Sequence, residues 1–234
     1  MRNIIVYAVI LTSFISFEQR THAQQVMSVT GTVIDQTTRN PVSILVSFFD
    51  RNNKKIGSSK SNSATGYYLV TGLKQGETYK VQLESSDFFK DEYEITLPVS
   101  KKYADVSRDF TVKPLVKGAR ILLEVPPFEL KKSKLRVGAE DYLADIKKML
   151  VLNPGVSVEI QTYPDSDGDP AVNEAFTMER AQAIKKYLVD NGVKDQKLSL
   201  KASGQTDGVN PPPKYKTAKG KRYIGPIYVV ITKV

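Results

Sequence analysis

Residues 158–181 read VEIQTYPDSDGDPAVNEAFTMERA, and this stretch decides how the second half of the chain is expected to fold. At its start, Val158 and Ile160 alternate with polar residues, as in a strand with one buried face. An acidic turn follows, and from Thr177 onwards the apolar residues return at helical spacing. We therefore predict a strand, an acidic turn and a helix that has Thr177 as its N-cap residue.

The flanking segments continue this succession of strands and helices. The segment AEDYLADIKKMLVLNPG, residues 139–155, spaces its apolar residues three and four apart and ends in Asn-Pro-Gly, which predicts a helix. Alternating apolar residues in KLSLKA, residues 197–202, and PIYVVITKV, residues 226–234, predict two strands. With an opening strand near residue 119, residues 116–234 have the order β-α-β-α-β-β. This order predicts an α/β sandwich with its helices on one sheet face.

The first half of the chain has a shorter period. Runs rich in valine, tyrosine, phenylalanine and threonine alternate with turn residues about every ten positions. These runs are SVTGTVID, SILVSFF, GYYLV, YKVQLES, EYEITLP and RDFTVKP. Within YKVQLES, the residues Tyr79, Val81 and Leu83 fall on one face of the expected strand. We therefore predict two domains, an all-β antiparallel sandwich over residues 24–115 followed by the α/β domain.

The amino terminus and the composition limit the possible functions. Arg2, the apolar run after it and the small residue Ala23 predict a signal peptide over residues 1–23 and a periplasmic location. The only histidine is His22, inside that segment, and the chain has no cysteine. Because Ser–His and Cys–His nucleophiles and the usual zinc ligands are then missing, we expect no enzyme activity, cofactor or metal. The net charge of +9 suits anionic surroundings without selecting among them.

Four phrases in the second half resemble the OmpA-like peptidoglycan-binding domain and cover most of residues 119–234. They are RILLEVPPFELKKSKLR, YLADIKKMLVLNPGVSVEIQTYPDSDGD, VNEAFTMERAQAIKKYLVDNGV and KLSLKASGQTDGVNP. The resemblance implies a non-catalytic protein of the cell envelope, associated with the outer membrane or the wall. Its partner would be the peptidoglycan stem peptide, gripped at the free end of diaminopimelate. That end is a zwitterion, so its ammonium is matched by a carboxylate and its carboxylate by a guanidinium.

The first half resembles the carboxypeptidase-regulatory-like domain, a transthyretin-like sandwich. The phrases that carry this resemblance are GTVIDQTTRNPVSILVSFFD, TGYYLVTGLKQGETYKVQLES and RDFTVKPL. Such domains have no catalytic residues. The resemblance therefore implies a spacer or a docking module for envelope protein partners.

The OmpA-like resemblance also assigns candidate binding residues. Asp165 falls on the binding aspartate of the family, and Arg180 falls on a helix arginine that packs against the site loop. Further candidates on or beside motif positions are Thr162, Tyr163, Asn173 and Thr177.

The last strand departs from the family pattern. If its alternation fixes the alignment, the paired arginines of the family fall on Gly225 and Pro226. A shifted alignment offers Lys221 or Arg222 as substitutes. We therefore expect Asp165 to hold the ammonium alone, so that binding to the wall is weak.

The same residues leave other functions open. Asp165, Asp167 and Asp169 could hold calcium, although glycine and glutamate do not fall where a helix–loop–helix calcium site needs them. Asp169-Pro170 could instead cap a helix. The basic segment 210–223 suggests nucleic acid, which a secreted location argues against. The main alternative is a protein-interaction subunit of an envelope assembly whose degenerate site no longer binds peptidoglycan.

Overall fold

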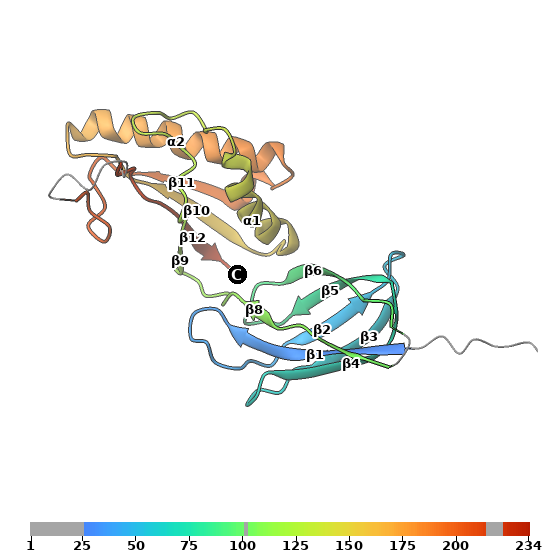
Figure 1. Ribbon diagram of the computed structural model, residues 1–234. Coiled ribbons are helices and arrows are strands. Elements are labelled where there is room, and N and C mark those ends of the chain that lie inside the picture. The colour runs from blue at the N-terminus through green and yellow to red at the C-terminus, as the bar shows by residue number, and fades with distance from the viewer. Residues whose placement is uncertain (1–25, 101–102, 214–221) are drawn as a thin grey trace, which may run out of the picture.

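The structure is a computed structural model that describes residues 26–100, 103–213 and 222–234 (Figure 1). The predicted signal peptide and Lys221 lie outside these residues. The described strands form three four-stranded sheets, two in the first half of the chain and one in the second, where both helices lie. Neither helix combines the length and the hydropathy that crossing a membrane would require.

The first half folds as two facing sheets, as Figure 1 shows. One sheet contains β4 (Tyr67–Lys74), β1 (Val26–Asp35), β7 (Asp105–Ser107) and β8 (Phe110–Val112). The other has the order β3 (Lys55–Lys60), β2 (Leu45–Phe49), β5 (Thr78–Glu84) and β6 (Asp91–Thr96). The inward face predicted for β5 is confirmed, because Tyr79, Val81 and Leu83 are all buried in the cluster between the sheets. The assignment of residues 24–115 to a carboxypeptidase-regulatory-like domain stays a prediction.

The sandwich predicted to be antiparallel contains two parallel strand pairs. β1 pairs with β4 in antiparallel fashion but with β7 and β8 in parallel. Two residues, Arg108 and Asp109, connect β7 to β8 beside β1. At this connection the Arg108 N–H donates to the Thr30 carbonyl at 2.7 Å. Gly31 is required beside this connection, since a Cβ there would lie 2.0 Å from the Arg108 oxygen. Apolar alternation carries no information on strand direction, so the sequence could not reveal this pairing.

The second half has the predicted order β-α-β-α-β-β. Its elements are β9 (Arg120–Leu122), α1 (Ala139–Leu152), β10 (Ser157–Thr162), α2 (Pro170–Asp190), η1 (Asp195–Lys197), β11 (Leu198–Ala202) and β12 (Ile227–Lys233). The sheet order is β11-β10-β12-β9, and both helices lie on the same side of it (Figure 1). Val158 and Ile160 of β10 are fully buried beneath Ala181, Ile184 and Leu188 of α2. The alternation read from the sequence therefore identified the core face correctly.

The start of α2 confirms the alternative cap at Asp169-Pro170 and not the cap predicted at Thr177. Thr177 is not the N-cap residue, because α2 begins seven residues earlier, at Pro170. Asp169 is the N-cap residue, and its carboxylate accepts hydrogen bonds from the backbone N–H groups of Ala171 and Val172 at 2.8 and 3.2 Å. Proline at the first helical position adds no unpaired donor. The first turns of α2 are largely exposed and lack an apolar period, so the periodic signal appears only from Thr177 onwards.

The two halves of the chain are in contact. Phe89, from the first half, is 4% exposed and belongs to the core cluster of the second half. Asn153, the C-cap residue of α1, accepts a hydrogen bond from the Lys90 N–H at 2.9 Å and donates one to the Lys90 carbonyl at 3.1 Å. Lys148 of α1 forms an ion pair with Asp91 at 2.7 Å. These contacts join the second sheet of the first half to α1.

Candidate functional site

The carboxylate of Asp165, in the turn after β10, lies against the guanidinium of Arg180 on α2. Nη1 donates to Oδ1 at 2.6 Å and Nη2 donates to Oδ2 at 2.9 Å, so the ion pair is bidentate. The Arg180 side chain is 0% exposed and the Asp165 side chain is 5% exposed. Two backbone donors complete the contacts of the carboxylate, the N–H of Lys131 and the N–H of Gly225, each at 2.8 Å.

The guanidinium has further partners in the loop that precedes α1. Its Nε donates to the Lys132 carbonyl at 2.9 Å, and Nη2 also donates to the Glu129 carbonyl at 3.1 Å. The rings of Phe128 and Phe176 lie 5.1 and 4.3 Å from its central carbon. The ion pair therefore ties α2 to the acidic turn, the 129–132 loop and the segment before β12. Removing one partner of such a buried pair costs about 3–5 kcal/mol, because the other charge stays buried.

The register of β12 determines what faces Asp165. Thr162 pairs with Ile227 and Ile160 pairs with Val229, which confirms that Ile227 and Val229 point into the core. This register places Gly225 directly beside the turn. A Cβ on Gly225 would lie 1.9 Å from the Tyr163 carbonyl oxygen, so a larger residue cannot occupy this position without displacing the turn.

The expectation that Asp165 holds a ligand ammonium stays a prediction, but in the structure this carboxylate is not without partners. Its oxygens are already bonded to Arg180 and to two backbone N–H groups, and its side chain points inward. The guanidinium that lies against Asp165 comes from Arg180 on α2 and not from β12. The pair is nevertheless chemically complementary to a zwitterion, since one carboxylate and one guanidinium lie side by side.

The other candidate residues fall into two groups. Thr162 and Thr177 are buried, and the Thr162 hydroxyl donates to the Thr177 carbonyl at 2.8 Å, so both position the start of the turn against α2. Asn173 connects the acidic turn to the loop after β11, because its Nδ2 donates to the carbonyl oxygens of Ser166 and of Gly204, each at 3.2 Å. Tyr163 is half-buried and Arg222 is exposed, whereas Lys221 lies outside the described residues.

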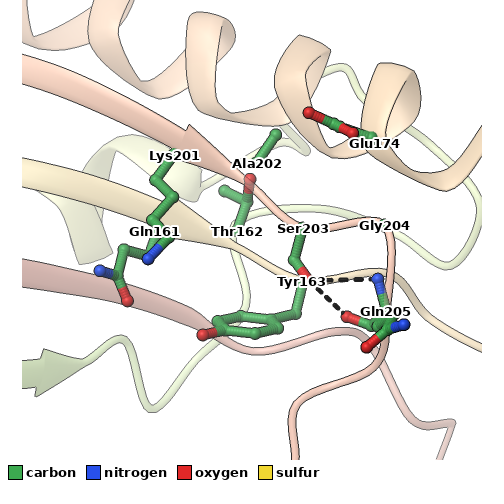
Figure 2. Close-up of a pocket in the computed structure, with 9 residues that line it drawn as sticks. All are labelled: Gln161, Thr162, Tyr163, Glu174, Lys201, Ala202, Ser203, Gly204 and Gln205. Carbon is green, nitrogen blue, oxygen red and sulfur yellow. Dashed lines mark hydrogen bonds between the residues drawn. The ribbon is translucent and has the colours of Figure 1, made fainter. Parts of the chain in front are cut away.

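A polar cavity of about 270 Å³ lies beside the start of the turn (Figure 2). Gln161, Thr162 and Tyr163 come from the end of β10, Glu174 from α2, and Lys201 to Gln205 from the end of β11. Figure 2 shows the Ser203 hydroxyl hydrogen-bonded to the backbone of Gln205. The lining combines one cation, one carboxylate, amides and a phenol. This composition suits a polar ligand.

A second polar cluster, formed by Asp207 and Tyr228, was not predicted from the sequence. Asp207 is buried and accepts hydrogen bonds from the Tyr228 hydroxyl and from the N–H groups of Val209 and Asn210. Burial by itself would raise the pKa of the Asp207 carboxyl, but these hydrogen bonds and the nearby Arg120 hold that pKa below its usual value. The cluster fixes the loop after β11. Only the three-dimensional path of that loop brings Asp207 to Tyr228.

Burial and the Asp207 carboxylate also shift the pKa values of two neighbouring tyrosines, Tyr223 and Tyr228. Burial, followed by the charge of Asp207, raises the pKa of Tyr223 to about 12. Burial and the hydrogen bond to Asp207 also raise the pKa of Tyr228. The guanidinium of Arg120 lies 3.9 Å from the centre of the Tyr228 ring and donates to the Tyr163 hydroxyl at 3.3 Å. Tyr223 and Tyr228 are therefore neutral hydrogen-bonding groups at neutral pH.

The three carboxylates of the acidic turn have separate partners. Asp165 pairs with Arg180, Asp167 accepts from the Thr206 hydroxyl at 2.7 Å, and Asp169 caps α2. Among the residues that the structure describes, no group of three or more His, Cys, Asp or Glu side chains is placed to hold a metal ion. Each carboxylate of the turn therefore stabilises a different local contact.

Comparison with known proteins assigns the second half of the chain. Residues 127–222 match the model of the OmpA family. The protein therefore contains an OmpA-family domain, and this domain includes Asp165 and Arg180.

Similar proteins match parts of the chain. The peptidoglycan-associated lipoprotein from Burkholderia pseudomallei is 19% identical, with a TM-score of 0.37 over 44% of this chain and 86% of that one. The periplasmic domain of Helicobacter pylori MotB is 11% identical, with a TM-score of 0.39 over 66% of this chain and 82% of that one.

Two further matches have different coverage. The OmpA-like domain of FopA1 from Francisella tularensis is 14% identical, with a TM-score of 0.36 over 50% of this chain and 84% of that one. Among curated proteins, the photosystem I P700 chlorophyll a apoprotein A2 of Gloeobacter violaceus is 31% identical over 107 residues. That match covers 45% of this chain but only 12% of the curated protein.

Proposed function

We propose that this protein is a non-catalytic, periplasmic protein of the cell envelope that associates with peptidoglycan through its OmpA-family domain. The observation that carries the proposal is the bidentate pair of Asp165 and Arg180, two residues within the range that matches the OmpA family. The ligand we propose is the stem peptide, held at the zwitterionic end of diaminopimelate.

The chemistry of the pair supports this ligand. A zwitterion brings an ammonium for Asp165 and a carboxylate for Arg180, so one internal ion pair is exchanged for two with the ligand. Tyr163, Asn173 and Arg222 would contribute to the rim of the site, while Thr162 and Thr177 hold its base. Lys221, outside the described residues, stays a predicted contact of the ligand. The polar cavity beside the turn offers room for the rest of a polar ligand.

The closed geometry predicts weak binding. A ligand ammonium must displace the N–H groups of Lys131 and Gly225 from the Asp165 carboxylate. Hydrogen bonds to a charged group contribute about 1.5–3 kcal/mol each, so opening both lowers the apparent affinity roughly a hundred- to ten-thousandfold. The ion pairs that the ligand forms with Asp165 and Arg180 would offset part of this loss of binding free energy.

A second candidate function is a protein-interaction subunit of an envelope assembly. The burial of both charged side chains favours it, because a site with 0% and 5% exposure offers no charge to a ligand until it opens. In that case the ion pair acts only as an internal connection between α2 and its loops. In both proposals the β-sandwich is a docking module or spacer, which the contacts of Phe89 and Asn153 hold against α1.

Sedimentation with purified diaminopimelate-type peptidoglycan distinguishes the two functions. We would compare the wild type with Asp165→Asn, which removes the charge at nearly constant volume. Asp167→Asn is the matched control, since it removes the same charge from an exposed position in the same turn. We expect the wild type and Asp167→Asn to sediment with the wall, and Asp165→Asn to remain in solution.

Three results would contradict this account. If the wild type stays in solution, the protein-interaction function is favoured. Equal sedimentation of Asp165→Asn and the wild type would mean that the wall binds elsewhere. Loss of all binding at high salt, with no difference between variants, would indicate attraction by the net charge alone. Circular dichroism of each variant checks that the fold is intact.

A further inference from the structure

Strand β9 is an edge of the sheet in the second half, and its outer backbone groups face away from the sheet. The Leu123 N–H donates to Ile227 and the Ile231 N–H donates to Ala119, so residues 119, 121 and 123 face β12. In an antiparallel pair, the residues between these positions direct their N–H and C=O groups to the other side. Arg120 and Leu122 therefore present unpaired main-chain donors and acceptors, because β9 has no second neighbour in the described sheet.

This edge lies along a groove of about 810 Å³. The groove is lined by residues 119–125, by the start of α1, and by a third group of residues. This third group consists of Gln36, Thr37 and residues of the segment 113–116, which connects the two halves of the chain. Several apolar side chains at the groove are exposed, among them Leu122 at 40% and Tyr142 at 42%. The groove thus combines an unpaired strand edge with apolar surface from both halves of the chain.

Three acidic and two basic residues line the groove, whereas basic residues outnumber acidic ones in the chain as a whole, which carries +9. Glu124, Asp141 and Asp145 line it, and within the described residues none of the three forms an ion pair. The guanidinium of Arg120 is turned away onto the ring of Tyr228 at 3.9 Å. Lys113 is the other basic residue of the lining. A segment that carries positive charge is the complementary occupant.

We propose that this groove binds an extended, basic segment of a partner protein, which adds a strand to the sheet at β9. The unpaired N–H and C=O groups of Arg120 and Leu122 define an extended backbone, as in other cases of strand addition. The apolar wall accepts apolar side chains at alternate positions, and the carboxylates accept lysine or arginine between them. The proposal does not depend on wall binding, because none of its residues belongs to the Asp165–Arg180 pair.

Binding of a designed probe tests the proposal. The probe is a short fluorescein-labelled peptide of alternating lysine and valine, and fluorescence anisotropy measures its affinity. Leu122→Pro removes the outward N–H without removing any bond to β12, and Leu122→Val is a control of similar volume that keeps this N–H. We expect Leu122→Pro to weaken binding roughly three- to tenfold and Leu122→Val to leave it nearly unchanged.

A second set of variants tests the charge without touching the strand. Asp141→Asn combined with Asp145→Asn should weaken binding of the same probe and reduce its salt dependence, whereas Asp167→Asn should do neither. The proposal would be overturned by equal binding of a glutamate–valine peptide, or by equal affinity of the proline and valine variants. A dimer in sedimentation velocity that Leu122→Pro dissolves would also overturn it, because a second copy of the chain would then be the occupant.

Discussion

Replacing Arg180 with methionine perturbs the ion pair at the centre of the site. The change removes the guanidinium and keeps an apolar side chain between Phe128 and Phe176. Asp165 then stays buried with only two backbone donors, and the Glu129 and Lys132 carbonyl oxygens lose their donor. Breaking a buried pair in this way costs about 3–5 kcal/mol of unfolding free energy. For a chain of this size, that loss lowers the melting temperature by about 6–20 °C.

Urea unfolding followed by far-UV circular dichroism and tyrosine fluorescence measures this loss, since the chain contains no tryptophan. Arg222→Met is the matched control at an exposed arginine, and we expect it to change stability by less than about 0.5 kcal/mol. In a double-mutant cycle with Asp165→Asn, the two losses should not add, because each variant breaks the same pair. A loss below about 1 kcal/mol for Arg180→Met, or strict additivity, would refute the inference that this pair is buried and mutually dependent.

The remaining predictions concern the packing, the capping and the pH response of the same domain. Gly225→Ala should destabilise the protein by about 1–3 kcal/mol because its Cβ would overlap the turn after β10, whereas Gly208→Ala, which has open space, should not. Asp169→Ala should remove the N-cap of α2 and cost about 1 kcal/mol in urea unfolding, and Asp167→Ala should cost less. The pKa of Tyr223 is raised to about 12 in the folded state, so its contribution to stability is complete below pH 10 and is lost as the pH rises towards 12. Urea unfolding at pH 9 and pH 11 measures this loss, and equal stability at both values would contradict it.

Sequence reasoning succeeded where burial imposes a period on the chain. Val158 and Ile160 had to face the core because a strand buries alternate residues, and a one-residue slip would expose them. The same alternation placed Ile227 and Val229 correctly, and with them the register that brings Gly225 to the acidic turn. The order of helices and strands in the second half followed from these periods.

Sequence reasoning failed for helix boundaries that lie among solvent-facing residues. It also failed for hydrogen-bond partners that only the path of a loop brings together. The first turns of α2 are exposed, so no apolar period marked them, and only the cap signal of Asp169-Pro170 indicated where the helix begins. The match of Asp165 and Arg180 to the family motif was visible in the sequence, but the closure of the pair was not. That closure depends on where the N–H groups of Lys131 and Gly225 come to lie, and these residues are remote from the turn in the chain. Likewise, nothing in the sequence connected Asp207 to Tyr228.

The most direct test of the central claim is an NMR titration of the Arg180 Nε–Hε signal. The ligand is a soluble stem tripeptide ending in diaminopimelate, and the control is the same peptide with lysine, which lacks the terminal carboxylate. If the ion pair opens to receive the zwitterion, the diaminopimelate peptide should shift the Arg180 signal in a saturable way and the lysine peptide should shift it much less. An Arg180 signal that stays unchanged, or that responds equally to both peptides, would contradict the proposed role of the pair in wall recognition.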